Sequence, residues 1–186
     1  MDELSRLAAP MVDGDLLIEA LREDHRGALK AACAQDRDIW SIYSVSYAPD
    51  RFDASFDLLR SRPNWRAFAI VLDDEMVGMS GFLGIDTERR VLEIGNTYYV
   101  PRLRGTGFNG RVKELMMRRA VDCGFRRIEF RVDARNARSQ AALAKIGATR
   151  EGVLRADRIT WTGHVRDTVL FSILAEEWVP QAPLVG

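Results

Sequence analysis

The stretch RLRGTGFNG, residues 102–110, carries three glycines whose spacing could do chemistry. Gly105, Gly107 and Gly110 match the pattern G-x-G-x-x-G, in which glycines let main-chain N–H groups converge on an anion. A helix that starts there adds about half a positive charge at its N-terminus. The stretch therefore predicts a phosphate or pyrophosphate site, with a plain glycine-rich turn as the alternative.

Two other phosphate motifs fit this stretch less well. A dinucleotide-binding fold needs a strand running directly into the glycines, whereas residues 101–104 intervene and only 76 residues follow Gly110. The P-loop alternative, G-x-x-x-x-G-R-V, puts Val112 where a hydroxyl must bind Mg²⁺. The remaining pattern begins at Arg102 as Arg-x-x-Gly-x-Gly, and it suits a pyrophosphate.

Glu93 is the candidate general base. In LEIGNTYY it lies on the opposite strand face from Leu92 and Ile94, and the alternative is a surface or ion-paired carboxylate. No Ser-His-Asp or Cys-His spacing suggests a covalent intermediate. Cys33 and Cys123 stand alone in helical stretches, which predicts buried free thiols and no metal site.

The elements that must position these groups follow from hydrophobic periodicity and turn residues. Strands are predicted over residues 13–21, 65–72, 76–85, 90–100 and 126–133, followed by a hairpin of residues 150–161 and 164–174. Helices are predicted over residues 23–35, 52–60, from the glycine turn to Gly124, and 137–146. The order of these elements predicts a mixed α/β chain.

Length and composition predict one domain. The chain has 186 residues, of which 47% are hydrophobic and 29% charged, typical of a globular protein. The domain is expected over residues 1–178, with a loose C-terminal tail at 179–186. The longest apolar run, residues 67–72, is too short for a membrane span, and the acidic start lacks a secretion signal. We therefore expect a cytoplasmic protein with no membrane partner.

The formal net charge of zero hides an uneven distribution. Residues 1–60 carry a net charge of −5, which suits a cationic amine as substrate, and residues 102–138 carry +7. The basic segment raises nucleic-acid binding as a hypothesis. However, only Phe108, Phe125 and Phe130 fall within it, so it lacks the interleaved aromatic platform of nucleic-acid binders.

The order of these motifs resembles the GNAT acyl-CoA N-acyltransferases over residues 16–178. The Arg102 pattern follows a strand, and Asn136-x-x-Ser139 opens a later helix that ends at Gly147. More narrowly, VLEIGNTYYVPRLRGTG, VDARNARSQAALAKIGATREGVLR and VRDTVLFSILAEEW resemble the branch of the ribosomal-protein-alanine N-acetyltransferases. The resemblance implies a GNAT fold of the α/β (α+β) class. Its mixed, mostly antiparallel sheet would have about seven strands, splayed between the fourth and fifth to hold acetyl-CoA, with helices on both faces.

The resemblance also implies roles for particular residues. Acetyl-CoA would be bound by Asn96, Tyr98, Tyr99, Val100, Arg102, Arg104, Gly105, Thr106, Gly107, Phe108, Asn109, Gly110, Asn136 and Ser139. Ser139 matches the proton donor of the ribosomal-protein branch, although Ser139 and Asn136 could equally serve as helix-capping residues. Leu143 stands where many members have a tyrosine acid, so that route is absent. The acceptor pocket would involve Trp40, Tyr43, Tyr47 and Arg51.

The implied activity is transfer of an acetyl group from acetyl-CoA directly to a primary amine, either a protein N-terminus or a small molecule. No metal is required, and relatives often pair as homodimers. The alternative is a catalytically idle acyl-CoA sensor or scaffold, because the tyrosine is missing and the sequence does not fix which residue is the base.

Overall fold

The computed structural model describes residues 3–179, and an eight-stranded sheet runs through it in the order β1-β2-β3-β4-β5-β6-β8-β7. Neighbouring strands are antiparallel except β5 and β6. The strands are β1 Met11–Asp13, β2 Leu16–Ala20, β3 Arg66–Leu72, β4 Glu75–Asp86, β5 Val91–Tyr99, β6 Arg127–Asp133, β7 Thr149–Ile159 and β8 Val165–Leu174. The helices are α1 Glu3–Leu7, α2 Arg26–Cys33, α3 Phe52–Ser61, α4 Phe108–Asp122 and α5 Ala137–Lys145, with 3-10 turns at Glu23–His25, Asp38–Ile42 and Pro101–Leu103.

The sheet has one strand more than predicted. The first predicted strand, residues 13–21, corresponds to β2, the second arm of a hairpin whose first arm is β1. Asp13 pairs with Leu16 across the tight turn between them, and Gly14 there has φ +57°. An Asp-Gly pair between apolar residues is a turn signal, so residues before it form their own edge strand, β1. The predicted division between the fourth and fifth strands therefore falls between β5 and β6.

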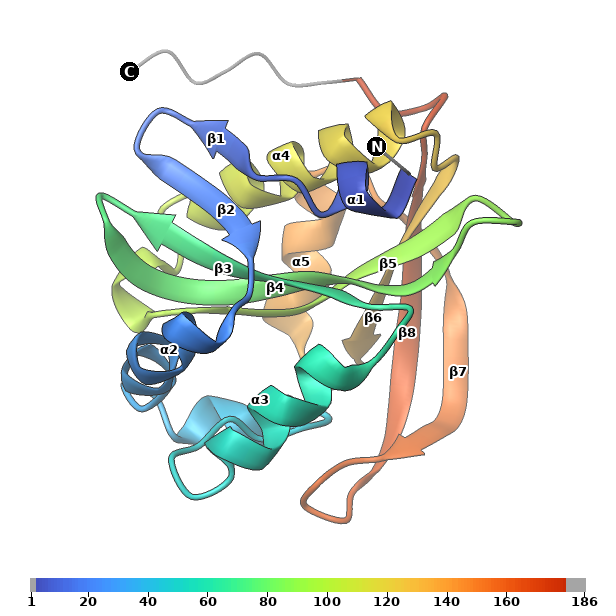
Figure 1. Ribbon diagram of the computed structural model, residues 1–186. Helices are drawn as coiled ribbons and strands as arrows, with labels where there is room; N and C mark the ends of the chain where they lie inside the picture. Colours follow the sequence, from blue (N-terminus) through green and yellow to red (C-terminus); the bar gives the residue numbers. More distant parts are fainter. Residues whose placement is uncertain (1–2, 180–186) are drawn as a thin grey trace.

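Helices cover both faces of the sheet, as predicted (Figure 1). α4 packs on one face, where Val112, Met116 and Ala120 join the larger apolar core with residues of most strands. α2 and α3 pack on the other face around a second core that includes Leu29, Phe56 and several aromatic side chains. The strands between are therefore buried on both faces, which holds the site on a rigid base.

The sheet opens between β5 and β6. Only three residue pairs join these strands, ending at Glu93 opposite Glu129, and beyond them β6 pairs with β8 alone. A bulge in β5 accompanies the opening: Asn96 and Thr97 together oppose one residue of β4, and Asn96 has φ +53°. A bulge bends its strand and turns main-chain groups out of the ladder. The bulged residues Asn96 and Thr97 line the opening.

The two helices beside the opening begin and end where the sequence predicts. α4 starts after Gly107 and is followed by Gly124 with φ +83°, and α5 is capped by Asn136 and followed by Gly147 with φ +81°. Glycine is favoured at these positions because an L side chain is strained there. The predicted tail at 179–186 lies, except for Val179, outside the described residues.

Candidate active site

Two cavities meet at the opening between β5 and β6. The larger, about 460 Å³, lies between the glycine turn, the end of β5 and one face of α5. The smaller, about 210 Å³, is enclosed by β5, β6, the end of β7 and residues 42–65. The side chains or main chain of five residues line both: Tyr43, Thr97, Lys113, Asn136 and Ser139. The two cavities therefore adjoin at these residues.

The glycine turn presents free main-chain donors to the larger cavity. Within residues 3–179, the N–H groups of Gly105, Thr106, Gly107 and Asn109 donate to no protein acceptor. Gly105 and Gly107 have φ +81° and +89°, and a Cβ on either would meet open space. These glycines are needed for their backbone angles and not to relieve crowding. Such an array at a helix N-terminus fits an anion such as a pyrophosphate.

The side chains of the turn differ in what they face. Arg104 lines the larger cavity, where it donates to the Tyr99 carbonyl at 3.1 Å and pairs with Asp36. Arg102 pairs instead with Glu75 at 2.6 Å and lines neither cavity. Thr106 turns its hydroxyl back to the Leu103 carbonyl. Of the two predicted arginines, only Arg104 is in position for a ligand in this cavity.

Among the predicted cofactor residues, three aromatic ones and a valine are part of the core with their side chains. The Phe108 ring packs against Tyr99 at 5.2 Å, Tyr98 donates to the Ala32 carbonyl, and Val100 is fully buried. Tyr98 and Tyr99 line the larger cavity, whereas Phe108 and Val100 do not. Only the main chain of Phe108 and Val100 is left for a ligand.

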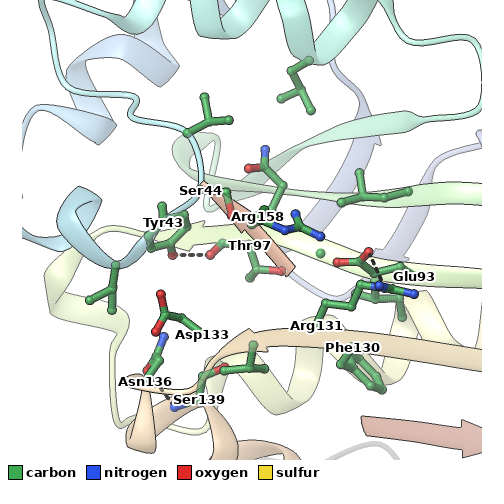
Figure 2. A pocket seen from close by; sticks show the side chains of 18 of the residues that line it. Tyr43, Ser44, Glu93, Thr97, Phe130, Arg131, Asp133, Asn136, Ser139 and Arg158 are labelled. Atoms are coloured by element: carbon green, nitrogen blue, oxygen red, sulfur yellow. Dashed lines mark hydrogen bonds and ion pairs between the residues drawn. The ribbon is translucent and has the colours of Figure 1, made fainter. Parts of the chain in front are cut away.

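Thr97 lies at the centre of the bulge, between the predicted residues Asn96 and Tyr98. Its carbonyl accepts from the Tyr43 hydroxyl at 2.5 Å, and its hydroxyl bonds Ser80 at 2.8 Å (Figure 2). The neighbouring Asn96 donates through Nδ2 to the Tyr47 hydroxyl at 2.9 Å and lines the smaller cavity. Burial raises the pKa of Tyr43 to about 12, so this hydroxyl stays protonated.

Glu93 projects into the smaller cavity at the point where the strands separate (Figure 2). Burial raises the pKa of its carboxyl to about 7, against the attraction of Arg131, Arg158 and Arg166. Its nearest cation is Arg131, with Nε 3.7 Å from Oε2. A carboxyl with a pKa near 7 can take a proton and release it at neutral pH.

Asn136 and Ser139 lie on the opposite side of the junction, at the start of α5 (Figure 2). The Asn136 side chain accepts from the Ser139 main-chain N–H at 3.0 Å, so the capping alternative is realised for Asn136. Both residues nevertheless line both cavities. The Ser139 hydroxyl is therefore available at the junction in addition to the cap beside it.

The four predicted acceptor residues separate into two pairs. Tyr43 and Tyr47 line the smaller cavity. Trp40 is fully buried and its ring stacks on that of Tyr98, with 4.7 Å between the ring centroids. Trp40 lines neither cavity and packs behind the residues that do. Arg51 lies over the Trp161 ring, 5.0 Å from its centroid, and lines neither cavity.

Lys113 is a site residue that sequence reasoning missed. It lies on the inner face of α4, is 7% exposed, and holds its ammonium 5.0 Å from the centroid of the Phe130 ring. Burial lowers the pKa of Lys113 to about 8. The sequence did carry a signal for this position. Lys113 precedes Met116 by three residues and Met117 by four, which places it on the same buried face of the helix.

Two further absences hold for the part of the chain that the structure describes. No group of three histidine, cysteine or acidic side chains there could hold a metal ion. No helix between residues 3 and 179 is long and apolar enough to cross a membrane. Cys33 and Cys123 are buried free thiols, as predicted.

The sequence matches the profile of the acetyltransferase (GNAT) domain over residues 15–149. The chain belongs to the GNAT acetyltransferase family. It is accordingly an acetyltransferase, of a family that uses acetyl-CoA as acyl donor. The chain is also 32% identical over 148 residues to the uncharacterized N-acetyltransferase p20 of Bacillus licheniformis, covering 76% of this chain and 79% of the relative.

Solved GNAT structures share the fold. One from T. thermophilus, assigned as an acetyltransferase, is 31% identical and superposes with a TM-score of 0.83 over 91% of this chain and 90% of its own. The ribosomal-protein-S5-alanine acetyltransferase of Vibrio fischeri is 15% identical, with a TM-score of 0.73 over 92% of this chain and 100% of its own. At 15% identity, this similarity to the ribosomal-protein branch shows a shared fold alone.

Proposed function

We propose that this chain transfers the acetyl group of acetyl-CoA from the larger cavity to a primary amine in the smaller one. The single observation that carries the proposal is that the two cavities share lining residues, among them Thr97 and Ser139, while Glu93 lines the smaller cavity. A thioester on one side and an amine on the other would meet there, which is the main requirement for direct transfer.

Acetyl-CoA is proposed to bind with its pyrophosphate on the free N–H groups from Gly105 to Asn109. Arg104 adds a cation on the β5 side of the cavity, and Arg138 and Lys145 add two from α5. The pantetheine arm would follow the bulged part of β5 toward the junction. The size of the larger cavity and its free donors support this placement.

Glu93 is proposed as the general base. An α-amine has a pKa of about 7.7–8.0 and a lysine amine one of about 10.4, so either is mostly protonated at pH 7. A carboxylate in contact with the amine, directly or through one water, removes that proton as the reaction begins. Its raised pKa suits this exchange at neutral pH.

The reaction itself forms one bond and breaks another. The amine nitrogen attacks the thioester carbonyl, the C–N bond forms and the C–S bond breaks. Glu93 first takes the ammonium proton and passes it to solvent, and then takes the second proton, which the nitrogen loses as the amide forms. The thiolate takes a proton from the Ser139 hydroxyl, which solvent reprotonates. A thiol of pKa about 8.5 leaves readily, so Ser139 has the lighter task.

Titration calorimetry with acetyl-CoA tests the donor site. Gly107→Glu should weaken binding at least tenfold, because it strains a left-handed residue and places a carboxylate where the phosphates bind. Gly163→Glu is the matched control: Gly163 has φ +83°, also faces open space, and lies in the β7–β8 turn. If wild-type protein binds no acetyl-CoA, or if both variants bind it as wild type does, the proposal is wrong.

Release of free thiol with a panel of amines tests the transfer step. Wild-type protein should release CoA thiol with at least one primary amine, and Glu93→Gln should slow that release. Binding of acetyl-CoA without thiol release from any amine would instead support the idle sensor or scaffold.

A further inference from the structure

The smaller cavity is strongly cationic. Its lining includes two acids, Glu93 and Asp133, against five cations: Arg62, Lys113, Arg131, Arg158 and Arg166. Neither acid offsets that charge fully, since Asp133 accepts from Arg135 at 2.7 Å and the pKa of Glu93 is raised to about 7 by burial. The acidic first third of the chain suits a cationic amine, but the cavity itself has the opposite charge.

Two of these cations are held face to face by the strand register. Arg158 of β7 pairs directly with Arg166 of β8, and like charges at such positions destabilise a sheet. A bulge in β7, with Ala156 at φ +50°, shifts the register so that this pairing occurs. Figure 2 shows Arg158 and Arg131 entering the cavity from different strands toward Glu93.

Arg166 is also incompletely satisfied. It is 5% exposed, its Nη1 donates to Ser44 at 2.7 Å and its Nη2 to the Arg131 carbonyl at 3.1 Å, while its buried Nε has no acceptor among the described residues. Burial first, and then Arg158, lower the pKa of Arg166. The Arg158 side chain donates to its neighbour Asp157 at 2.9 Å, and Arg131 bonds Glu129 at 3.2 Å. An anion in this cavity would offset the repulsion between Arg158 and Arg166.

Resting on the proposed function, we infer that the acceptor is a small primary amine bearing a carboxylate or phosphate, whose anion binds Arg158 and Arg166. Guanidinium groups bind both anions in a bidentate manner. The cavity of about 210 Å³ is smaller than the roughly 300–1,000 Å³ of pockets for drug-sized ligands. With the anion on β7 and β8, the amine of such a molecule faces Glu93 and the junction.

Matched pairs of amines test the inference. β-Alanine is compared with β-alaninamide, and phosphoethanolamine with ethanolamine, while 1,4-diaminobutane is the cationic probe. We expect kcat/KM for each anionic amine to exceed that of its neutral partner at least tenfold. The two pairs also show whether the carboxylate or the phosphate is preferred. Equal or better transfer to the neutral or cationic amines overturns the inference and leaves the proposed function standing.

Arg158→Gln separates recognition from folding. It should raise KM for the anionic amines about tenfold more than KM for their neutral partners, whereas Arg155→Gln, an exposed neighbour on β7 outside the cavity, should change nothing. Titration of phosphoethanolamine and β-alanine onto CoA-bound protein gives the same comparison without turnover. If the protein binds acetyl-CoA yet neither binds nor acetylates the anionic amines, the inference is wrong. If acetyl-CoA itself does not bind, the proposed function fails instead.

Discussion

At the scale of single residues, Glu93 combines the conditions that a general base needs. It lies at the last pair joining β5 and β6, projects into the smaller cavity, and is buried enough to raise its pKa to about 7. Three arginines oppose that rise without cancelling it. Desolvation is therefore the main determinant of its proton affinity.

Replacing Glu93 by glutamine should lower kcat/KM about 100-fold at pH 8, within the usual range for loss of a general base. The base acts in its deprotonated form, so wild-type activity should rise as the pH rises through about 7. The variant should lose that dependence. Steady-state thiol release between pH 5.5 and 9 measures both. Glu88→Gln, at an exposed position, is the control, and an unchanged pH profile in Glu93→Gln would contradict the assignment.

Glu93→Gln should also change the stability of the protein, and in the opposite direction to its activity. Because the folded-state pKa of Glu93 is raised, the folded protein binds more protons than the unfolded chain between about pH 4.5 and pH 7. This carboxyl therefore reduces stability as the pH rises through that window. Glu93→Gln should melt a few degrees higher than wild type at pH 8 and at nearly the same temperature at pH 4. A loss of activity with higher stability would separate catalysis from folding.

At the scale of secondary-structure elements, strand β5 controls where the base points. A Cβ built on Gly95 would lie 2.6 Å from Glu93 Oε1 and 2.8 Å from Leu83 Cδ1. The absence of a side chain at Gly95 is what allows the carboxylate to lie over the strand. Gly95 is therefore a positioning residue for Glu93.

Gly95→Ala should displace the Glu93 carboxylate and lower kcat/KM about tenfold. A displaced carboxylate gains water, so the lower limb of the pH profile should move to lower pH. Acetyl-CoA affinity, measured by calorimetry, should stay at the wild-type value because the glycine turn is unaffected. Gly152→Ala is the control, since a Cβ there meets open space on β7. Equal effects of the two variants would argue against the positioning role.

At the scale of the whole molecule, one segment joins the two arms of the divided sheet. Residues 38–47 bond β5 through Tyr43 and Thr97, and they bond the β7–β8 hairpin through the Trp40 carbonyl, which accepts from Trp161 Nε1 at 2.7 Å. Arg166 of β8 bonds Ser44 in the same segment. The arms thus separate at the active site without losing their connection.

A coenzyme bound between the arms should stabilise the whole fold. A ligand at 100 times its Kd adds about 2.7 kcal/mol to the free energy of unfolding. For a chain of this size that corresponds to a rise in Tm of about 5–10 °C. Differential scanning fluorimetry with acetyl-CoA measures it, with pantetheine as the control that lacks the pyrophosphate. A Tm indifferent to acetyl-CoA would contradict binding across the opening.

Much of the fold could be predicted because its signals are local. The αL glycines at residues 107, 124 and 147, the Asn136 cap and the alternating strands depend on neighbours in sequence, and the structure confirms them. The extra strand β1 was missed although its Asp13-Gly14 turn was visible. The expected homodimer, the cytoplasmic location and the avoidance of nucleic acid stay predictions.

By itself the sequence determined the order of elements, the glycine turn with its free donors, and Glu93 as the candidate base. Only the tertiary structure decided which side chains share the cavities. Lys113, Thr97 and the pair Arg158 and Arg166 meet there through strand register and two bulges that bring distant residues together. The physical reason is the sequence separation over which each feature is determined. Backbone angles and caps depend on a few adjacent residues, whereas a cavity's charge depends on which distant side chains the sheet brings face to face.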